Sequence, residues 1–261
     1  MKTPLPLFIG SILFFFILYF GFSKVSPEIR NPEKSGDLKK VDTDLNQLVQ
    51  PYRDSLKANE RGVFDVLEQK LQQASSDSVK QIALEEISGF WYKLGNVGLA
   101  AEYAQKLAEL FPSGDRWAIA ATNFILAAKQ PNAPDLSRSS WIEKAKAGFA
   151  QAQLVEPENL NHQVNLALIN VDYPPQDQPM TGILQLRALN AKYPENVLVL
   201  YHLARLAIQT NQWDKAKERL NTILKLKPDF ERAYCLMIEV AKHENDLAAV
   251  KSLSSKCNSK N

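Results

Sequence analysis

Residues 197–230 read VLVLYHLARLAIQTNQWDKAKERLNTILKLKPDF and decide the fold of this chain. They hold two amphipathic runs, which meet near Asn211, and the second run ends at Pro228. A proline ends a helix because it lacks an amide hydrogen and biases the residue before it away from helical geometry. The stretch therefore predicts a hairpin of two helices.

The proline recurs along the chain at Pro112, Pro157, Pro194 and Pro228, at intervals of 45, 37 and 34 residues. We take 34 as the length of one unit and assign the surplus to longer turns inside two hairpins, at residues 130–140 and 173–179. A repeat of this length is typical of a solenoid of stacked helical hairpins.

Small residues recur in register with these prolines. With the proline at position 32, position 20 is Ala100, Ala145, Gly182 or Ala216, and position 8 is Ser88, Thr122, Ala167 or Ala204. In the second unit the register could slip by one, which would place Ala120 and Ala121 at positions 7 and 8. The axes of packed helices lie about 8–10 Å apart, and small side chains at the contact allow the shorter distances. We therefore predict that paired helices cross at these residues.

The pattern resembles the tetratricopeptide repeat family over about residues 81–257. The fourth unit has that family's signature residues at Leu200, Leu203, Ala204, Ala207, Asn211, Trp213, Ala216, Leu220, Ile223 and Pro228. The resemblance implies an all-α fold, a right-handed α-solenoid of helical hairpins. Its units would span about residues 81–114, 115–159, 160–196, 197–230 and 231–257, the last as a polar cap.

The segments before the repeats differ in composition. Residues 1–22 contain a charge-free run, residues 5–22, which is just long enough to cross a bilayer. It lacks small residues at its exit, so we expect an uncleaved transmembrane anchor rather than a removed signal peptide. Residues 23–44 are expected to form a flexible polar linker, and residues 45–80 a degenerate helical hairpin.

The side of the membrane is harder to predict. Lysine and arginine counts near the anchor place the repeats in the cytoplasm. Analogy with N-terminal anchors of bacterial repeat proteins places them in the periplasm. We expect a single-pass protein of the inner membrane with periplasmic repeats, and the cytoplasmic side stays open.

Composition and motifs give little sign of catalysis. The net charge of +2 does not call for nucleic acid. We expect Cys235 and Cys257 to act as small hydrophobic residues. His162, His202 and His243 point in different directions on their predicted helices, so we expect no metal site. We also expect no cofactor, no small-molecule substrate and no enzymatic activity.

The resemblance implies a groove along the first helix of each unit. Positions 2, 5, 9, 12 and 13 line that groove in the family. Here they include Glu85, Tyr92, Lys93, Arg116, Asn123, Asn161, Asp172, Tyr201, Arg205, Gln209, Arg232, Glu239 and Lys242. Tyr201, Arg205 and Arg232 are our first choice for peptide contact, because tyrosine and arginine dominate binding hot spots.

The leading hypothesis is a membrane-tethered scaffold that binds a segment of a partner protein in this groove, in envelope or complex assembly. One alternative is an envelope enzyme with a helical-repeat body, for which the two long turns offer Asp135, Arg138, Asp172 and Asp177. Another is a structural protein that self-associates through the ends of the solenoid.

Overall fold

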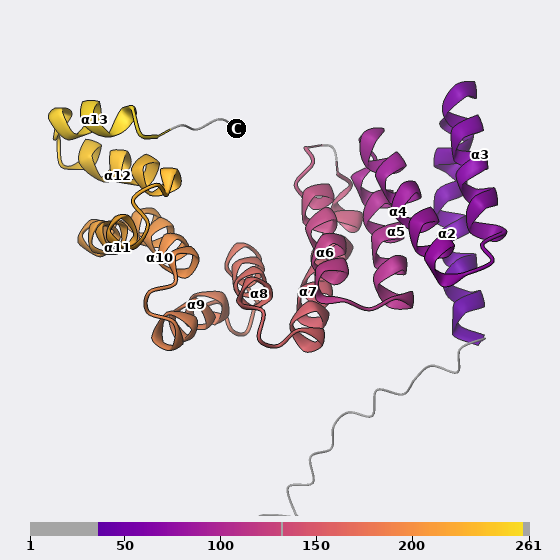
Figure 1. Cartoon of the computed structure of the whole chain (residues 1–261), viewed down its shortest axis with the longest axis horizontal. Helices are drawn as coiled ribbons and strands as arrows, with labels where there is room; N and C mark the ends of the chain where they lie inside the picture. The colour runs from indigo at the N-terminus through magenta and orange to yellow at the C-terminus, as the bar shows by residue number, and fades with distance from the viewer. Residues whose placement is uncertain (1–35, 132, 258–261) are drawn as a thin grey trace, which may run out of the picture. The chain divides into compact units, whose positions relative to one another are not determined.

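The computed structural model describes the backbone of residues 36–131 and 133–257. It divides the chain into two compact units, Met1–Leu56 and Lys57–Asn261, and each is described by itself. In the first unit the described part contains α2 (Gly36–Ser55). The second unit contains α3 (Ala58–Gln72), α4 (Asp77–Lys93), α5 (Val97–Leu110), α6 (Gly114–Ala128), α7 (Asp135–Val155), α8 (Leu160–Asp172), α9 (Thr181–Lys192), α10 (Val197–Gln209), α11 (Trp213–Leu226), α12 (Glu231–His243) and α13 (Leu247–Ser254) (Figure 1).

The helices of the second unit form the predicted hairpins. The pairs α4 and α5, α6 and α7, α8 and α9, α10 and α11, and α12 and α13 correspond to the five units read from the sequence. No strand occurs in residues 36–131 or 133–257. The prediction of an all-α helical repeat is therefore confirmed.

The crossing points lie where the small residues predicted them. Ala100, Ala145 and Ala216 are fully buried at position 20 of their units. The Ser88 hydroxyl at position 8 donates a hydrogen bond to the carbonyl oxygen of Ala100 at 2.8 Å. At Gly182 a Cβ atom would lie 2.4 Å from the backbone nitrogen of Val171 and 2.5 Å from the carbonyl oxygen of Ala167. Only glycine fits this approach of α9 to α8.

The second repeat unit, formed by α6 and α7, has the slipped register. Thr122 is exposed, whereas Ala121 is fully buried. A Cβ atom at Gly148 of α7 would contact the Cβ atom of Ala121 at 3.0 Å. Ala120 and Ala121, not Ala121 and Thr122, are therefore the packing residues of α6.

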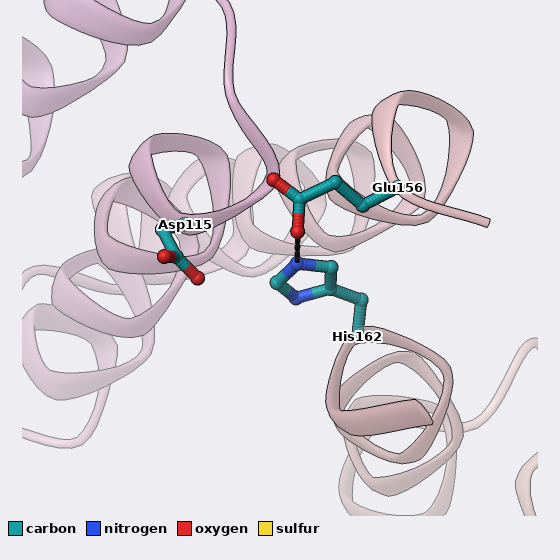
Figure 2. A group of neighbouring side chains, drawn as sticks. All are labelled: Asp115, Glu156 and His162. Carbon is teal, nitrogen blue, oxygen red and sulfur yellow. Dashed lines mark hydrogen bonds and ion pairs between the residues drawn. The ribbon is translucent and has the colours of Figure 1, made fainter. Parts of the chain in front are cut away.

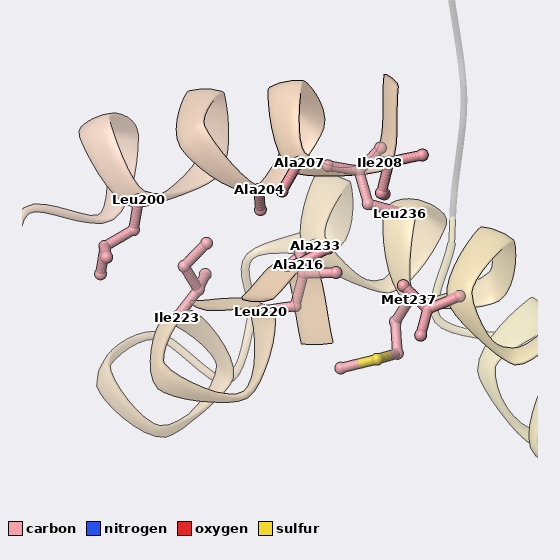
Figure 3. Packing of buried hydrophobic residues seen from close by; sticks show 11 residues of the cluster. Leu200, Ala204, Ala207, Ile208, Ala216, Leu220, Ile223, Ala233, Leu236 and Met237 are labelled. Atoms are coloured by element: carbon pink, nitrogen blue, oxygen red, sulfur yellow. The ribbon is translucent and has the colours of Figure 1, made fainter. Parts of the chain in front are cut away.

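Neighbouring hairpins share one core. Figure 3 shows the cluster in which Leu200, Ala204, Ala207 and Ile208 of α10 meet residues of α11 and α12. The other members are Ala216, Leu220, Ile223, Ala233, Leu236, Met237 and Val240. Because α12 belongs to the next hairpin, burial of these apolar side chains stabilises each hairpin only together with its neighbour.

Three of the hairpin turns have the same geometry. Gly95, Asn211 and Asn245 each have a positive φ angle, of 80°, 57° and 58°. The next amide then bonds to a carbonyl oxygen five residues back, for example Gln212 to Ala207 at 2.8 Å. Glycine and asparagine are the residues that adopt this left-handed conformation most readily. The backbone conformation of these turns therefore favours glycine or asparagine at these three positions.

The long turn of the second repeat unit, between α6 and α7, is shorter than predicted. We expected residues 130–140 to lie in the turn, but α7 begins at Asp135 and absorbs the second half of them. Pro134 stands directly before the first turn of α7. The Arg138 guanidinium donates hydrogen bonds to the carbonyl oxygens of Ala128 and Ala133, at 3.0 and 3.1 Å. These bonds satisfy backbone groups at the end of α6 and in the loop, so the extra residues extend a helix.

Gly98 and Trp141 form a close contact between the first and second hairpins. Gly98 lies inside α5, and a Cβ atom there would be 2.6 Å from Cζ2 of Trp141. The tryptophan of α7 therefore packs on α5 at a site that only glycine leaves open.

The segment before the repeats is partly helical. We expected a flexible linker over residues 23–44, but residues 36–44 belong to α2. Leu38, Val41, Leu45 and Leu48 recur there at helical spacing. The pairing of α2 with α3 stays a prediction, because the two helices lie in separate units.

The predicted anchor, residues 5–22, lies outside the residues that the structure describes. None of the described helices has the length and apolar character needed to cross a membrane.

The two cysteines are joined. Cys235 of α12 and Cys257, beyond the end of α13, form a disulfide with Cα atoms 5.0 Å apart. The prediction that both act only as small hydrophobic residues is wrong. The two residues are 22 positions apart in sequence, but the α12–α13 hairpin folds back and brings the residue after α13 to the first turns of α12.

Candidate binding surface on the first helices

A hollow of about 360 Å³ opens between α4, α5 and α6. Five predicted groove residues line it: Glu85, Tyr92, Lys93, Arg116 and Asn123. The other residues of its wall are Ser88, Gly89, Ala104, Leu107 and Ile119. The structure therefore brings together side chains that the sequence placed on two successive first helices.

The two faces of α4 explain why these side chains point into the hollow. Ala83, Leu84, Ile87 and Trp91 are buried in the core. Glu85, Tyr92 and Lys93 are exposed, as is expected for the opposite side of an amphipathic helix. Arg116 is held in place, since its guanidinium donates to the carbonyl oxygen of Phe111 at 2.8 Å and to Gln81 Oε1 at 2.5 Å.

A second hollow of about 570 Å³ lies between α3 and α4. It shares Glu85, Gly89 and Lys93 with the first. Its remaining lining is mostly apolar: Val63, Leu67, Ile82, Glu86 and Phe90. The sequence did not suggest this hollow, because α3 lies before the units in which the repeat pattern is clear.

Gly89 lies where the two hollows meet. A Cβ atom there would have no other atom within 4 Å. Glycine is unfavourable inside a helix, and no packing constraint requires it at this position. The missing side chain keeps the surface between the two hollows open.

A smaller hollow of about 210 Å³ lies between α6, α7 and α8. Its lining includes the predicted residue Asp172, together with Thr122, Ile125, Phe149, Asn165, Leu168, Ile169 and Tyr173. Asp172 also forms an ion pair with Lys129 at 3.3 Å. The predicted residue Asn161 is exposed in the first turn of α8.

The first-choice residues on α10 and α12 have mixed environments. Tyr201 is partly buried and makes an edge-on contact with Phe230, with ring centroids 5.6 Å apart. Arg205 is partly buried, and its Nε atom has no hydrogen-bond partner among the described residues. Arg232 is exposed. Gln209, Glu239 and Lys242 are also exposed on these two helices.

Arg205 and Arg232 both act electrostatically on His202. Burial, Arg205 and Arg232 together lower the pKa of the His202 imidazole to about 4, whereas Asp172 raises it. The histidine is therefore neutral at physiological pH and senses positive charge from α10 and α12. The sequence alone did not single it out, because a histidine at helical spacing gives no sign of its neighbours.

We expect the NMR titration of His202 to have its midpoint near pH 4. The folded pKa is below the ordinary value of 6.5, so the unfolded chain binds a proton first as the pH falls. The stability that neutral His202 contributes is thus present above about pH 6.5 and is lost toward pH 4. Arg205→Ala should move the midpoint up and Asp172→Asn should move it down. A midpoint near 6.5 that neither substitution moves would contradict this arrangement.

Three of the four residues of the enzyme alternative, Asp135, Arg138 and Asp172, are engaged in other contacts. Arg138 binds backbone carbonyl oxygens and lies 4.0 Å from Asp135, and Asp172 pairs with Lys129. Asp177 lies in the turn between α8 and α9.

Comparison with known proteins identifies one segment of the chain. Residues 183–237 match the model of the family described as tetratricopeptide repeat. This segment is similar to a tetratricopeptide repeat. It runs from α9 into α12 and contains the α10–α11 hairpin whole. No curated protein matches the chain.

Several solved structures are similar to the chain. The Thermus thermophilus protein TTC0263, a thermophilic TPR protein, has 18% identity and a TM-score of 0.48, with 78% of this chain and 99% of that one covered. MamA from Desulfovibrio magneticus RS-1 has 14% identity, a TM-score of 0.45 and coverage of 70% and 95%. YrrB, a TPR protein with an unusual peptide-binding site, has 12% identity, a TM-score of 0.41 and coverage of 73% and 90%. At this level of similarity, no function is transferred from them.

Proposed function

We propose that this protein is a scaffold that binds a segment of a partner protein across the two hollows on either side of Gly89. The observation that carries the proposal is that the hollows share Glu85, Gly89 and Lys93 and have mostly apolar walls. A helical repeat with its first-helix faces open offers an extended surface for another chain.

The exposure of large apolar side chains supports this choice of surface. Tyr92, Ile119, Val63 and Ile82 line the hollows and are 51%, 56%, 53% and 45% exposed. Grouped apolar exposure of this kind marks interaction sites more often than scattered single residues do. Charges of both signs stand beside them, in Glu85, Glu86, Lys93 and Arg116. We therefore expect a partner segment with apolar anchors flanked by charged residues.

The surface on α10 and α12 is a second contact region in this proposal. Arg205 and Arg232 there would meet an acidic group of the partner. Tyr201 offers only part of its ring to a partner, because it packs on Phe230.

The substitution Gly89→Leu tests the proposal. A leucine there would occupy the junction of the hollows without meeting a neighbour within 4 Å of its Cβ atom, and it favours the helix more than glycine does. We expect an unchanged or higher melting temperature and loss of the partners that the wild-type full-length protein captures from native membranes. The control is Gly62→Leu on α3, where a Cβ atom also has open space. Equal capture by wild type and Gly89→Leu would contradict the proposal.

We propose further that residues 5–22 tether the protein to the inner membrane and that the repeats face the periplasm. The charge-free run supports the tether. The Cys235–Cys257 disulfide supports the side, because disulfides persist in oxidising compartments and are rare in the cytosol. Thiol labelling of acid-quenched cells tests the side. We expect both cysteines to be blocked until reductant is added, and labelling without reductant would contradict periplasmic repeats.

A further inference from the structure

Three residues that can bind metal meet at the junction of the second and third hairpins. Asp115 is the second residue of α6, Glu156 follows the last residue of α7, and His162 is the third residue of α8. One ligand atom from each lies within 4.8 Å of the other two. Figure 2 shows the imidazole joined to the Glu156 carboxylate, with Asp115 to the left of both. The start of α6, the end of α7 and the start of α8 therefore place their polar side chains at one point.

His162 is the fixed member of the group. Its side chain is almost fully buried, and its Nε2 atom lies 3.0 Å from Glu156 Oε2. Its Nδ1 atom is buried and has no hydrogen-bond partner among the described residues, so the contacts of the imidazole within this group are made by Nε2.

Glu156 is oriented by its neighbours. Its Oε1 atom accepts a hydrogen bond from the Gly114 amide at 2.8 Å, and its Oε2 atom accepts one from the Asn159 side chain at 3.0 Å. Hydrogen bonds from Asn159, His162 and Gly114 lower the pKa of this carboxyl group, so it is ionised at neutral pH. A Cβ atom at Gly114 would lie 2.4 Å from His162 Nε2 and 2.5 Å from Glu156 Cδ. Glycine is required there for the imidazole and the carboxylate to meet.

Asp115 adds a second carboxylate. It is exposed and turns toward the imidazole, and no hydrogen bond joins it to Glu156 or His162 in Figure 2. The hydrogen bonds among Gly114, Glu156, Asn159 and His162 form without it. That network therefore does not require a second carboxylate at this point.

We propose that Asp115, Glu156 and His162 bind a divalent transition-metal ion. Zn²⁺ is the ion that fits these ligands best. Zinc accepts imidazole nitrogen and carboxylate oxygen together, at about 2.0–2.2 Å. Calcium and magnesium take oxygen ligands, so the buried imidazole argues against them. Three protein ligands leave a fourth zinc position for water.

The present spacing is close to what zinc needs. Tetrahedral bonds of that length place ligand atoms roughly 3.4 Å apart. His162 Nε2 and Glu156 Oε2 are 3.0 Å apart, and the full set lies within 4.8 Å. The exposed Asp115 carboxylate can close the remaining distance while His162 stays in place. A bound ion would join the start of α6, the end of α7 and the start of α8, and so fix the third hairpin against the second.

Calorimetric titration of the full-length protein with ZnCl₂ tests the proposal, with the disulfide kept oxidised so that no thiolate competes for the metal. We expect one site, whose affinity falls as the pH falls because a ligating histidine must be deprotonated. Asp115→Asn should weaken the affinity at least tenfold. Zinc should raise the melting temperature of the wild type and not that of Asp115→Asn.

The variants separate metal binding from folding. Asp115 is exposed and lies outside the hydrogen-bond network, so Asp115→Asn should fold even if His162→Gln does not. Asp214→Asn is the matched control, because Asp214 is the second residue of α11 and is also exposed. No zinc binding, equal affinity in Asp115→Asn, or loss of binding on His202→Gln or His243→Gln instead would each overturn the proposal.

Discussion

Replacing Trp91 by alanine should lower the free energy of unfolding by about 3–5 kcal/mol. The side chain is 1% exposed and contacts the rings of Phe64 and Phe90, with centroids 5.0 and 5.2 Å away. Phe64 belongs to α3, so Trp91 joins that helix to the first hairpin. Its removal leaves a cavity that rigid neighbours cannot close, which adds to the lost transfer energy.

Urea denaturation of the full-length protein measures this loss. The neighbouring variant Tyr92→Ala is the control, because Tyr92 is half exposed and its removal should change stability by only about 0.5 kcal/mol. Tyr92→Ala should instead weaken partner capture, since Tyr92 lines the first hollow. Equal destabilisation by the two variants would mean that the two faces of α4 are assigned incorrectly.

Loss of the disulfide in Cys235→Ser should destabilise the last hairpin by about 3 kcal/mol, the chain-entropy value for a loop of this length. The bridge closes a segment of 22 residues, and α13 contributes no fully buried residue. Without the bridge, little apolar burial holds α13 against α12. Its release would expose Leu236 and Met237, which are 8% exposed in the intact protein.

Hydrogen exchange resolves this effect helix by helix. We expect the amides of α13 to lose protection in Cys235→Ser, and those of α4 and α5 to keep it. A reducing agent should reproduce the change in the wild type and have no further effect on the variant. Unchanged protection of α13 would show that packing alone holds the cap.

The hairpins could be read from the sequence because their determinants are local and repeated. A proline after each second helix and small residues at fixed distances before it locate both helices and their crossing. Gly182, Ala204 and Ala216 are buried where this pattern puts them. The exposed face of α4 followed from the same register, since Glu85 and Tyr92 lie opposite the core.

The features that the sequence did not reveal depend on contacts between residues far apart. Gly98 meets Trp141 of the next hairpin, and Cys235 meets Cys257 across the final turn. Glu156 and His162 are six residues apart, but Asp115 joins them only because α6 begins beside the end of α7. A search restricted to histidines missed this group, since its other two members are carboxylates.

The start of α7 shows a different limit. The serines and prolines of residues 130–140 favoured a turn. The Arg138 guanidinium satisfies carbonyl oxygens at the end of α6 and in the loop, and this allows a helix to begin at Asp135. A side chain that binds the backbone of the preceding helix leaves no signal in residue composition.

A pair of matched substitutions tests most directly the claim that paired helices cross where side chains are absent or minimal. Gly182→Ala adds one methyl group against the backbone of α8, and Gly62→Ala adds the same group in open space on α3. We predict that urea denaturation will show a loss of about 1–3 kcal/mol for the first and a gain of about 0.5–1 kcal/mol for the second. If Gly182→Ala is as stable as Gly62→Ala, α8 and α9 do not cross at this residue and the register of the repeat is wrong.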